Sequence, residues 1–99
     1  MQVIYTKDVI KFVAALDLVT KTKVLRLVDM LEKYGYNVRM PYSKALSAGL
    51  FELRVRGTLE IRIIYAFKDG GATLLHAFIK KSDRISRSDI QTALRKLST

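Results

Sequence analysis

Three segments of the chain alternate apolar and polar side chains, and this pattern constrains the fold more than any other feature. The alternation is strict in Leu50–Arg56, where apolar side chains occupy the odd positions and charged ones the even positions from Glu52 onward. Leu59–Phe67 and Ala72–Lys80 repeat it less regularly. A period of two is typical of β-strands, whose side chains point alternately to opposite faces. The segments therefore predict three strands, the first with one apolar and one charged face.

Short turn-forming sequences separate these strands, at Gly57-Thr58 and at Asp69–Gly71. Connections this short leave no room for the long crossover that joins parallel strands, so the expected sheet is antiparallel. A residue and its direct partner on the neighbouring strand share a face, so the charged positions stay together only in certain registers.

One register keeps the charged side chains on a single face. A three-residue loop at Gly57–Leu59 pairs Arg54 with Arg62. A five-residue loop at Phe67–Gly71 pairs Arg62 with His76. The prediction is a row formed by these two arginines and the histidine, which crosses the three strands on a solvent-facing surface. Two further cations are expected nearby, Arg56 and Lys80.

Two helices are expected before the strands. Apolar side chains follow the i, i+3, i+4, i+7 spacing of one helix face in Lys7–Leu16 and again in Leu18–Tyr34. Thr6 is placed to cap the first helix, and Gly35 is placed to end the second. The short interval between them predicts a helical hairpin, preceded by a brief strand within Met1–Tyr5.

A third helix is expected at the end of the chain, where the helical spacing returns in Ile90–Leu97 after a capping sequence at Ser86–Asp89. Residues 35–49 lose the helical period and include Pro41, which predicts an irregular connection. The order of elements predicts one α+β domain over residues 1–99. Its parts are an N-terminal helical hairpin, a three- to four-stranded antiparallel sheet and a C-terminal helix.

The chain is strongly basic, with 18 Lys and Arg against 9 Asp and Glu and a formal net charge of +9. The excess is uneven, because residues 1–35 carry six basic and four acidic side chains whereas residues 36–99 carry twelve and five. A charge of this size favours a polyanionic partner such as a nucleic acid. The second part of the chain is therefore the expected place of the binding site.

Composition also excludes several kinds of chemistry. The chain has no cysteine and a single histidine, which excludes disulfides, thiolate catalysis and a metal site built from several histidines. We expect neither a metal nor another cofactor. The longest apolar runs, Phe12–Leu16 and Ile63–Phe67, are far shorter than the ~20 residues of a membrane span, and no signal-peptide pattern opens the sequence. We expect a soluble, cytoplasmic protein.

The predicted cationic row has two interpretations. A charged strand face is most often simply solvated, and Glu52 and Glu60 are able to neutralise two of its cations. Two arginines paired across strands repel each other, which favours instead an anion bound between them. The positive strip continues through Lys80, Lys81, Arg84, Arg87 and, from the preceding loop, Lys44. Tyr42 and Phe78 are placed to stack on a base, although Phe78 also fits the core.

His76 has two interpretations as well. A lone histidine between Leu75 and Ala77 is more often a hydrogen-bonded structural residue than a catalyst. Nearby cations, however, disfavour the imidazolium form and leave a neutral ring that accepts a proton near pH 7. Cleavage of RNA through the ribose 2′-hydroxyl requires such a base, together with cations and an acid. Either Lys80 or an arginine serves as the acid, or the leaving group departs with help from outside the protein.

Five motifs follow one another along the chain: Gly-Tyr-Asn at 35–37, Met-Pro-Tyr-Ser-Lys-Ala-Leu at 40–46, Gly-Leu-Phe-Glu-Leu-Arg-Val-Arg at 49–56, Arg-Ile-Ile-Tyr at 62–65 and Leu-Leu-His-Ala-Phe-Ile-Lys-Lys-Ser at 74–82. Together they resemble the HigB branch of the RelE/ParE toxin superfamily, including its phage-derived HigB-like members. The resemblance spans nearly the whole chain. It implies a RelE-like fold and the toxin half of a type II toxin–antitoxin pair.

The resemblance also implies an activity, which is cleavage of mRNA in the ribosomal A site by metal-free attack of the 2′-hydroxyl. It implies that Arg54 and Arg56 contact the region of the scissile phosphate and that Arg62 stabilises the transition state. His76 and Lys80 belong to the same motif, as does Lys81. The implied partners are mRNA on the ribosome and a helix-turn-helix antitoxin. The general acid and base stay open.

Three functional hypotheses follow. The first is a ribosome-dependent mRNA interferase with four catalytic residues, Arg54, Arg62, His76 and Lys80. Further cations would hold the RNA, namely Lys44, Arg56, Lys81, Arg84 and Arg87. The second is a non-catalytic, ParE-like inhibitor of DNA gyrase, and the third is a plain nucleic-acid-binding module.

Overall fold

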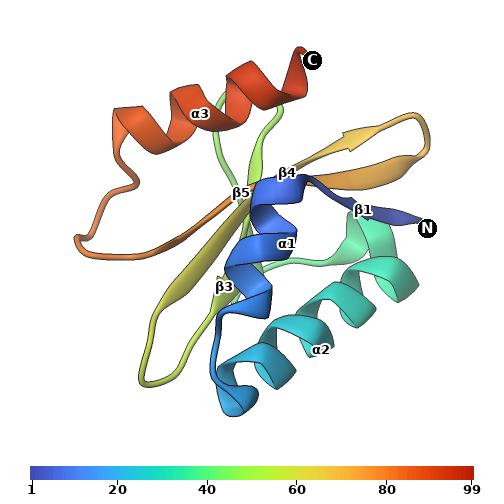
Figure 1. Cartoon of the computed structure of the whole chain (residues 1–99). Coiled ribbons are helices and arrows are strands. Elements are labelled where there is room, and N and C mark those ends of the chain that lie inside the picture. Colours follow the sequence, from blue (N-terminus) through green and yellow to red (C-terminus); the bar gives the residue numbers. More distant parts are fainter.

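A computed structural model describes residues 1–99 and contains three α-helices and one five-stranded sheet (Figure 1). The elements in chain order are β1 (Val3–Tyr5), α1 (Lys7–Ala14), α2 (Leu18–Tyr34), a 3₁₀ turn (Gly35–Asn37), β2 (Ser43–Ala45), β3 (Phe51–Val55), β4 (Ile61–Lys68), β5 (Gly71–Ile79) and α3 (Arg87–Leu97). None of the helices combines the length and the apolar character needed to cross a lipid bilayer.

The sheet is mixed, with the strand order β1-β5-β4-β3-β2. β1 pairs with β5 in parallel, and all other neighbours are antiparallel. The α+β class is confirmed, whereas the purely antiparallel sheet of three or four strands is wrong. Short turns join only β3, β4 and β5, so they support an antiparallel arrangement of these strands alone. Most of the chain separates β1 from β5 in sequence, so no short connection fixes the direction of β1. β2 has three residues, too few to show a period.

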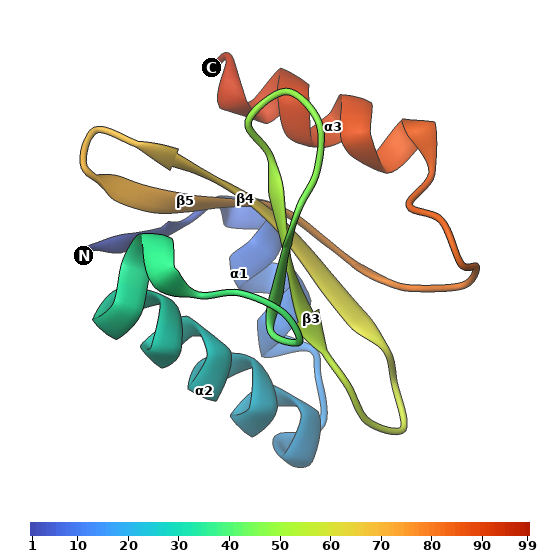
Figure 2. The same cartoon turned by 180° about the vertical axis from the view of Figure 1, so that it is seen from behind.

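Helices cover both faces of the sheet (Figures 1 and 2). On one face α1 and α2 pack on the odd-numbered side chains of β3 and β4, including Leu53 and Ile63. On the other face Ala93 of α3 packs against Ile64 and other buried apolar side chains. The expected solvent-facing surface is therefore wrong, because Ile64 and Ala66, the even positions that follow Arg62 in β4, are apolar and are covered by α3.

The helix ends follow local chemistry only in part. Asp17 caps α2 by accepting a hydrogen bond from the Thr20 N–H at 3.1 Å, and Ser86 caps α3 as predicted. Thr6 precedes α1, but its hydroxyl makes no capping bond and donates instead to the Leu75 carbonyl at 3.3 Å. Gly35 ends α2 with a φ of +52°, as expected for a glycine stop.

The first hairpin has the predicted register, in which Arg54 pairs with Arg62. The second differs. Asp69 and Gly70 have φ values of +53° and +78°, so a two-residue turn of the type I′ kind replaces the predicted five-residue loop. A bulge between Ile64 and Tyr65 then shifts the pairing, and Arg62 faces Phe78 rather than His76. The predicted row across three strands is therefore wrong in its third member.

Candidate functional site

Four of the predicted cations come together in one cavity beside β3, which we call the β3 cavity. Its volume is about 300 Å³. Its charged lining side chains are Lys44, Glu52, Arg54, Lys80, Asp83 and Arg84. β2 and β3 contribute the first three, and the segment that joins β5 to α3 contributes the others. Four cations against two carboxylates leave the cavity positively charged, which suits an anionic ligand.

The wall of the β3 cavity contains two buried polar atoms without a hydrogen-bond partner. Arg54 is 12% exposed, and its Nε lies 3.7 Å from Glu52 Oε1, a distance too long for a hydrogen bond. Nη1 of Arg54 contacts Met40 Sδ at 3.1 Å. Neither Arg54 Nε nor Glu52 Oε2 has a partner. Most buried polar groups in proteins are satisfied, so an unpaired donor and an unpaired acceptor beside the cavity are exceptional.

Arg62 pairs with Arg54 across β3 and β4, but it lies beneath the surface and does not line the cavity. Its side chain is 1% exposed, with Nη1 donating to the Ile61 carbonyl at 3.0 Å and Nη2 to Glu60 Oε1 at 3.4 Å. Glu60 Oε2 accepts from the Gly57 N–H at 3.2 Å. The Gly57 N–H and then Arg62 hold the pKa of the Glu60 carboxyl below its usual value.

His76 lies outside the β3 cavity. Its Nε2 is 2.7 Å from Asp89 Oδ1 in the first turn of α3, and Asp89 Oδ2 accepts from the Ser86 hydroxyl at 2.7 Å. The ring also stacks on Phe78, with centroids 5.4 Å apart. The nearest charge is therefore a carboxylate rather than the predicted Arg62. Sequence reasoning missed Asp89 as the partner, because its place in a capping sequence already accounted for it.

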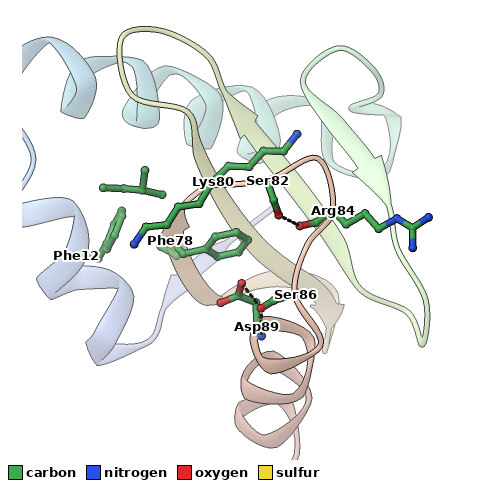
Figure 3. A pocket seen from close by; sticks show the side chains of 10 residues that line it. Phe12, Phe78, Lys80, Ser82, Arg84, Ser86 and Asp89 are labelled. Carbon is green, nitrogen blue, oxygen red and sulfur yellow. Dashed lines mark hydrogen bonds between the residues drawn. The ribbon is translucent and has the colours of Figure 1, made fainter.

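A second cavity, the β5 cavity, adjoins the first at the end of β5 (Figure 3). It has a volume of about 480 Å³, and it shares Lys80 and Arg84 with the β3 cavity. Lys81 and Phe78 also line it. Figure 3 shows the Arg84 guanidinium extending away from Phe78, while the Ser82 hydroxyl donates to the Arg84 carbonyl at 2.9 Å. The lining of the β5 cavity thus combines lysines with an aromatic residue.

A third cavity, the α2 groove, lies between α2 and the end of β3. Its volume is about 290 Å³, and it shares Arg54 with the β3 cavity. Arg56 and the 45%-exposed Tyr42 also line it. The sequence-based prediction lacks its two other cations, Lys23 and Arg26, because most of the excess of positive charge lies after residue 35. The sequence does indicate that these two cations share one face of a helix, because they are three residues apart and Arg26 precedes the buried Leu27.

The three cavities form one cationic belt around the edge of β3, since neighbouring cavities share cations. Its basic members are Lys23, Arg26, Lys44, Arg54, Arg56, Lys80, Lys81 and Arg84. Three carboxylates line the same cavities, Glu52, Asp83 and Asp89. Arg87 is exposed and lines none of them. No cluster of three or more His, Cys, Asp or Glu side chains suited to a metal ion occurs in residues 1–99.

Comparison with known proteins adds a family and a structural neighbour. The sequence profile of the family described as phage derived protein Gp49-like matches residues 11–98. No curated protein matches the sequence significantly. Among solved structures, a chain of the YoeB-YefM complex from Staphylococcus aureus has a TM-score of 0.59 and 14% sequence identity. The match covers 83% of this chain and 97% of that chain, and at this identity it concerns the fold.

Proposed function

Since the chain belongs to the Gp49-like family of phage derived proteins, we propose that it is a toxin of a toxin–antitoxin pair that cleaves RNA. The finer proposal is a ribosome-dependent mRNA interferase of the HigB kind. The observation that carries it is the β3 cavity, where Lys44, Arg54, Lys80 and Arg84 line one concave surface. A cleft that concentrates positive charge binds and orients a phosphodiester and stabilises the extra charge of its transition state.

The cationic belt supports single-stranded RNA as the substrate. A backbone that follows the belt meets positive charge in each of the three cavities, and aromatic side chains stand beside two of them. Phe78 lines the β5 cavity, and Tyr42 lines the α2 groove. Binding of single strands commonly combines a basic groove with aromatic rings that stack on bases.

The four proposed catalytic residues take two kinds of role. Arg54 and Lys80 line the β3 cavity, so we assign them to contact with the scissile phosphate region. Arg62 and His76 do not line it, so we assign them to positioning. Arg62 fixes the strand pair that presents Arg54, and His76 fixes the start of α3 through Asp89. Lys81, Arg84, Arg56 and Lys44 hold the RNA, whereas Arg87 lies apart from the belt.

The proposed partner is an antitoxin of the helix-turn-helix type that covers part of the belt. The structural neighbour belongs to a complex of two named components, which supports a protein partner. The α2 groove has apolar side chains such as Leu27 and Met30 on its floor and four cations around it. This combination fits an acidic, amphipathic segment of such an antitoxin. A segment bound there would contact Arg54 and so block the β3 cavity.

A translating cell extract tests the proposed function. Added wild-type protein should stop protein synthesis and shorten the mRNA. Lys80→Ala should abolish both effects, whereas Lys68→Ala, at the far end of β4, should act like wild type. Supercoiling by purified DNA gyrase should be unaffected. Inhibition of gyrase with intact mRNA would contradict the proposal and favour the ParE-like alternative, and binding of RNA without arrest would favour the plain binding module.

A further inference from the structure

The proposed reaction needs a general base, and His76 lies outside the β3 cavity where that base is required. Attack by the ribose 2′-hydroxyl requires a group that accepts its proton within hydrogen-bond reach. The His76 ring is held by Asp89 at 2.7 Å and is absent from the lining of the β3 cavity. The inference that follows rests on the proposed function, because it concerns the same cavity and the same reaction.

Glu52 is a carboxylate inside the β3 cavity. It lies on β3, where it pairs with Lys44 of β2 and with Ile64 of β4. Its side chain is 7% exposed, so two neighbouring strands hold it in place. A side chain that projects from a paired strand is positioned more accurately than one on a loop. Asp83, the other carboxylate of the cavity, is exposed in the connection before α3.

The two oxygens of Glu52 have different surroundings. Oε1 faces Arg54 Nε at 3.7 Å, which is an ion-pair distance without a hydrogen bond. Oε2 is buried and has no partner. A buried carboxylate oxygen left without a donor is costly, so a ligand that brings a hydroxyl to this position gains the missing hydrogen bond. The 2′-hydroxyl of a ribose is such a donor.

We propose that Glu52 is the general base of the cleavage. Its carboxylate accepts the proton of the 2′-hydroxyl while the 2′-oxygen forms a bond to the adjacent phosphorus. The bond from phosphorus to the 5′-oxygen breaks, and that oxygen takes a proton from the Lys80 ammonium. The products are a 2′,3′-cyclic phosphate and a 5′-hydroxyl. Proton exchange with water then restores both side chains.

The surrounding charges fit this division of work. Glu52 shares the cavity with four cations, two of which, Arg54 and Arg84, are guanidinium groups that carry charge at every relevant pH. These cations stabilise the negative charge that grows on the phosphoryl oxygens as the 2′-oxygen attacks.

Glu52→Gln tests the proposal, because it keeps the size of the side chain and removes its ability to accept a proton. We expect single-turnover cleavage of ribosome-bound mRNA to fall by about 100-fold or more. Binding to the programmed ribosome and the circular dichroism spectrum should be unchanged. Glu32→Gln, the same change on the exposed face of α2, is the matched control and should cleave like wild type. Cleavage by folded Glu52→Gln within about 3-fold of wild type would overturn the assignment.

A substrate with sulfur in place of the scissile 5′-oxygen separates the base from the acid. The thiolate leaves without needing a proton, so this substrate should restore cleavage by Lys80→Ala but not by Glu52→Gln. Restoration of Glu52→Gln would overturn the proposal. If that variant fails to fold, Glu52→Asp decides by the same comparison, because a shortened base should stay slow on both substrates. Wild-type protein that leaves ribosome-bound mRNA intact would instead refute the proposed function itself.

Discussion

Arg54 and Arg62 lie side by side on neighbouring strands, yet only Arg54 lines a cavity. Glu60 contacts the guanidinium of Arg62 at 3.4 Å, and Phe78 occupies the paired position on its other side. The repulsion expected between two paired arginines is therefore relieved by two carboxylates, because Glu60 lies beside Arg62 and Glu52 faces Arg54. Both arginines thus have a nearby carboxylate, and Arg54 still lines a positively charged cavity.

Arg62→Ala should reduce the free energy of unfolding by about 2–3 kcal/mol, since it empties a buried site and removes a partner of Glu60. Urea unfolding followed by circular dichroism measures this change. Arg56→Ala is the matched control. Its side chain is 56% exposed and 4.0 Å from Glu60, so its loss should cost no more than about 0.5 kcal/mol. Equal stability of the two variants would show that the burial of Arg62 carries no energetic weight.

Residue chemistry in the sequence predicted much of the candidate site. Lys44, Arg54, Lys80 and Arg84 were all predicted members, and they line one cavity. The position of His76 was not predictable in the same way, because it depends on one extra residue in the pairing of β4 with β5. The two-residue turn and the bulge together place His76 opposite Ile64, on the predicted face but two residues along β4 from Arg62, and neither leaves a mark in the alternation itself.

At the scale of elements, patterns with a strong period were predicted well. α2 spans Leu18–Tyr34 as expected, and α1 ends at Ala14, two residues before the expected Leu16. β3, β4 and β5 each begin and end within a few residues of the predicted bounds. β2 and the direction of β1 were not predictable, because three-residue strands take their structure from the neighbour they pair with.

The turn between β4 and β5 gives a prediction for a single element. Gly70 has a φ of +78°, and no atom lies within 4 Å of the place where a β-carbon would stand. Gly70→Ala should therefore lower the free energy of unfolding by about 1 kcal/mol through backbone strain alone. Gly70→Asn should lose less, because asparagine tolerates a positive φ. Chemical denaturation of both variants measures the difference, and an alanine variant as stable as wild type would exclude the turn geometry.

At the scale of the whole molecule, long-range contacts join the layers on the two faces of the sheet. Lys96 of α3 forms an ion pair with Asp8 of α1, across most of the chain length. Within this pair Lys96 donates a hydrogen bond to Asp8, which lowers the pKa of the Asp8 carboxyl. Hydrogen bonding to the Thr20 side chain, and then to its backbone N–H, lowers the pKa of the Asp17 carboxyl. The folded protein therefore holds these two protons less tightly than the unfolded chain does.

Acid should consequently destabilise the fold. A carboxyl with a lowered pKa adds stability above its ordinary value near 4, and this contribution disappears as the pH falls through the folded value. The urea midpoint should be constant from pH 7 to about pH 5 and fall below about pH 4. Asp17→Asn should weaken this dependence. A midpoint that rises on acidification would contradict the direction of the shifts.

The net charge of +9 is also a property of the whole molecule, and the fold gathers it selectively. Eight cations line the belt, and two of them, Lys23 and Arg26, come from the first part of the chain. The belt that we propose as the binding surface therefore extends to residues before 35. Packing of α2 next to the end of β3 brings the two parts together, which no count along the sequence reveals.

We propose that the β3 cavity cleaves mRNA on the ribosome. Mapping of new 5′ ends in an mRNA of known sequence, from a translating extract, measures this cleavage. Breaks are expected in register with the reading frame, at codons held in the ribosomal A site. These breaks should be absent with Arg54→Ala or Lys80→Ala and present with Lys68→Ala. Translation that stops while the mRNA stays whole, or breaks that persist in both cavity variants, would contradict it.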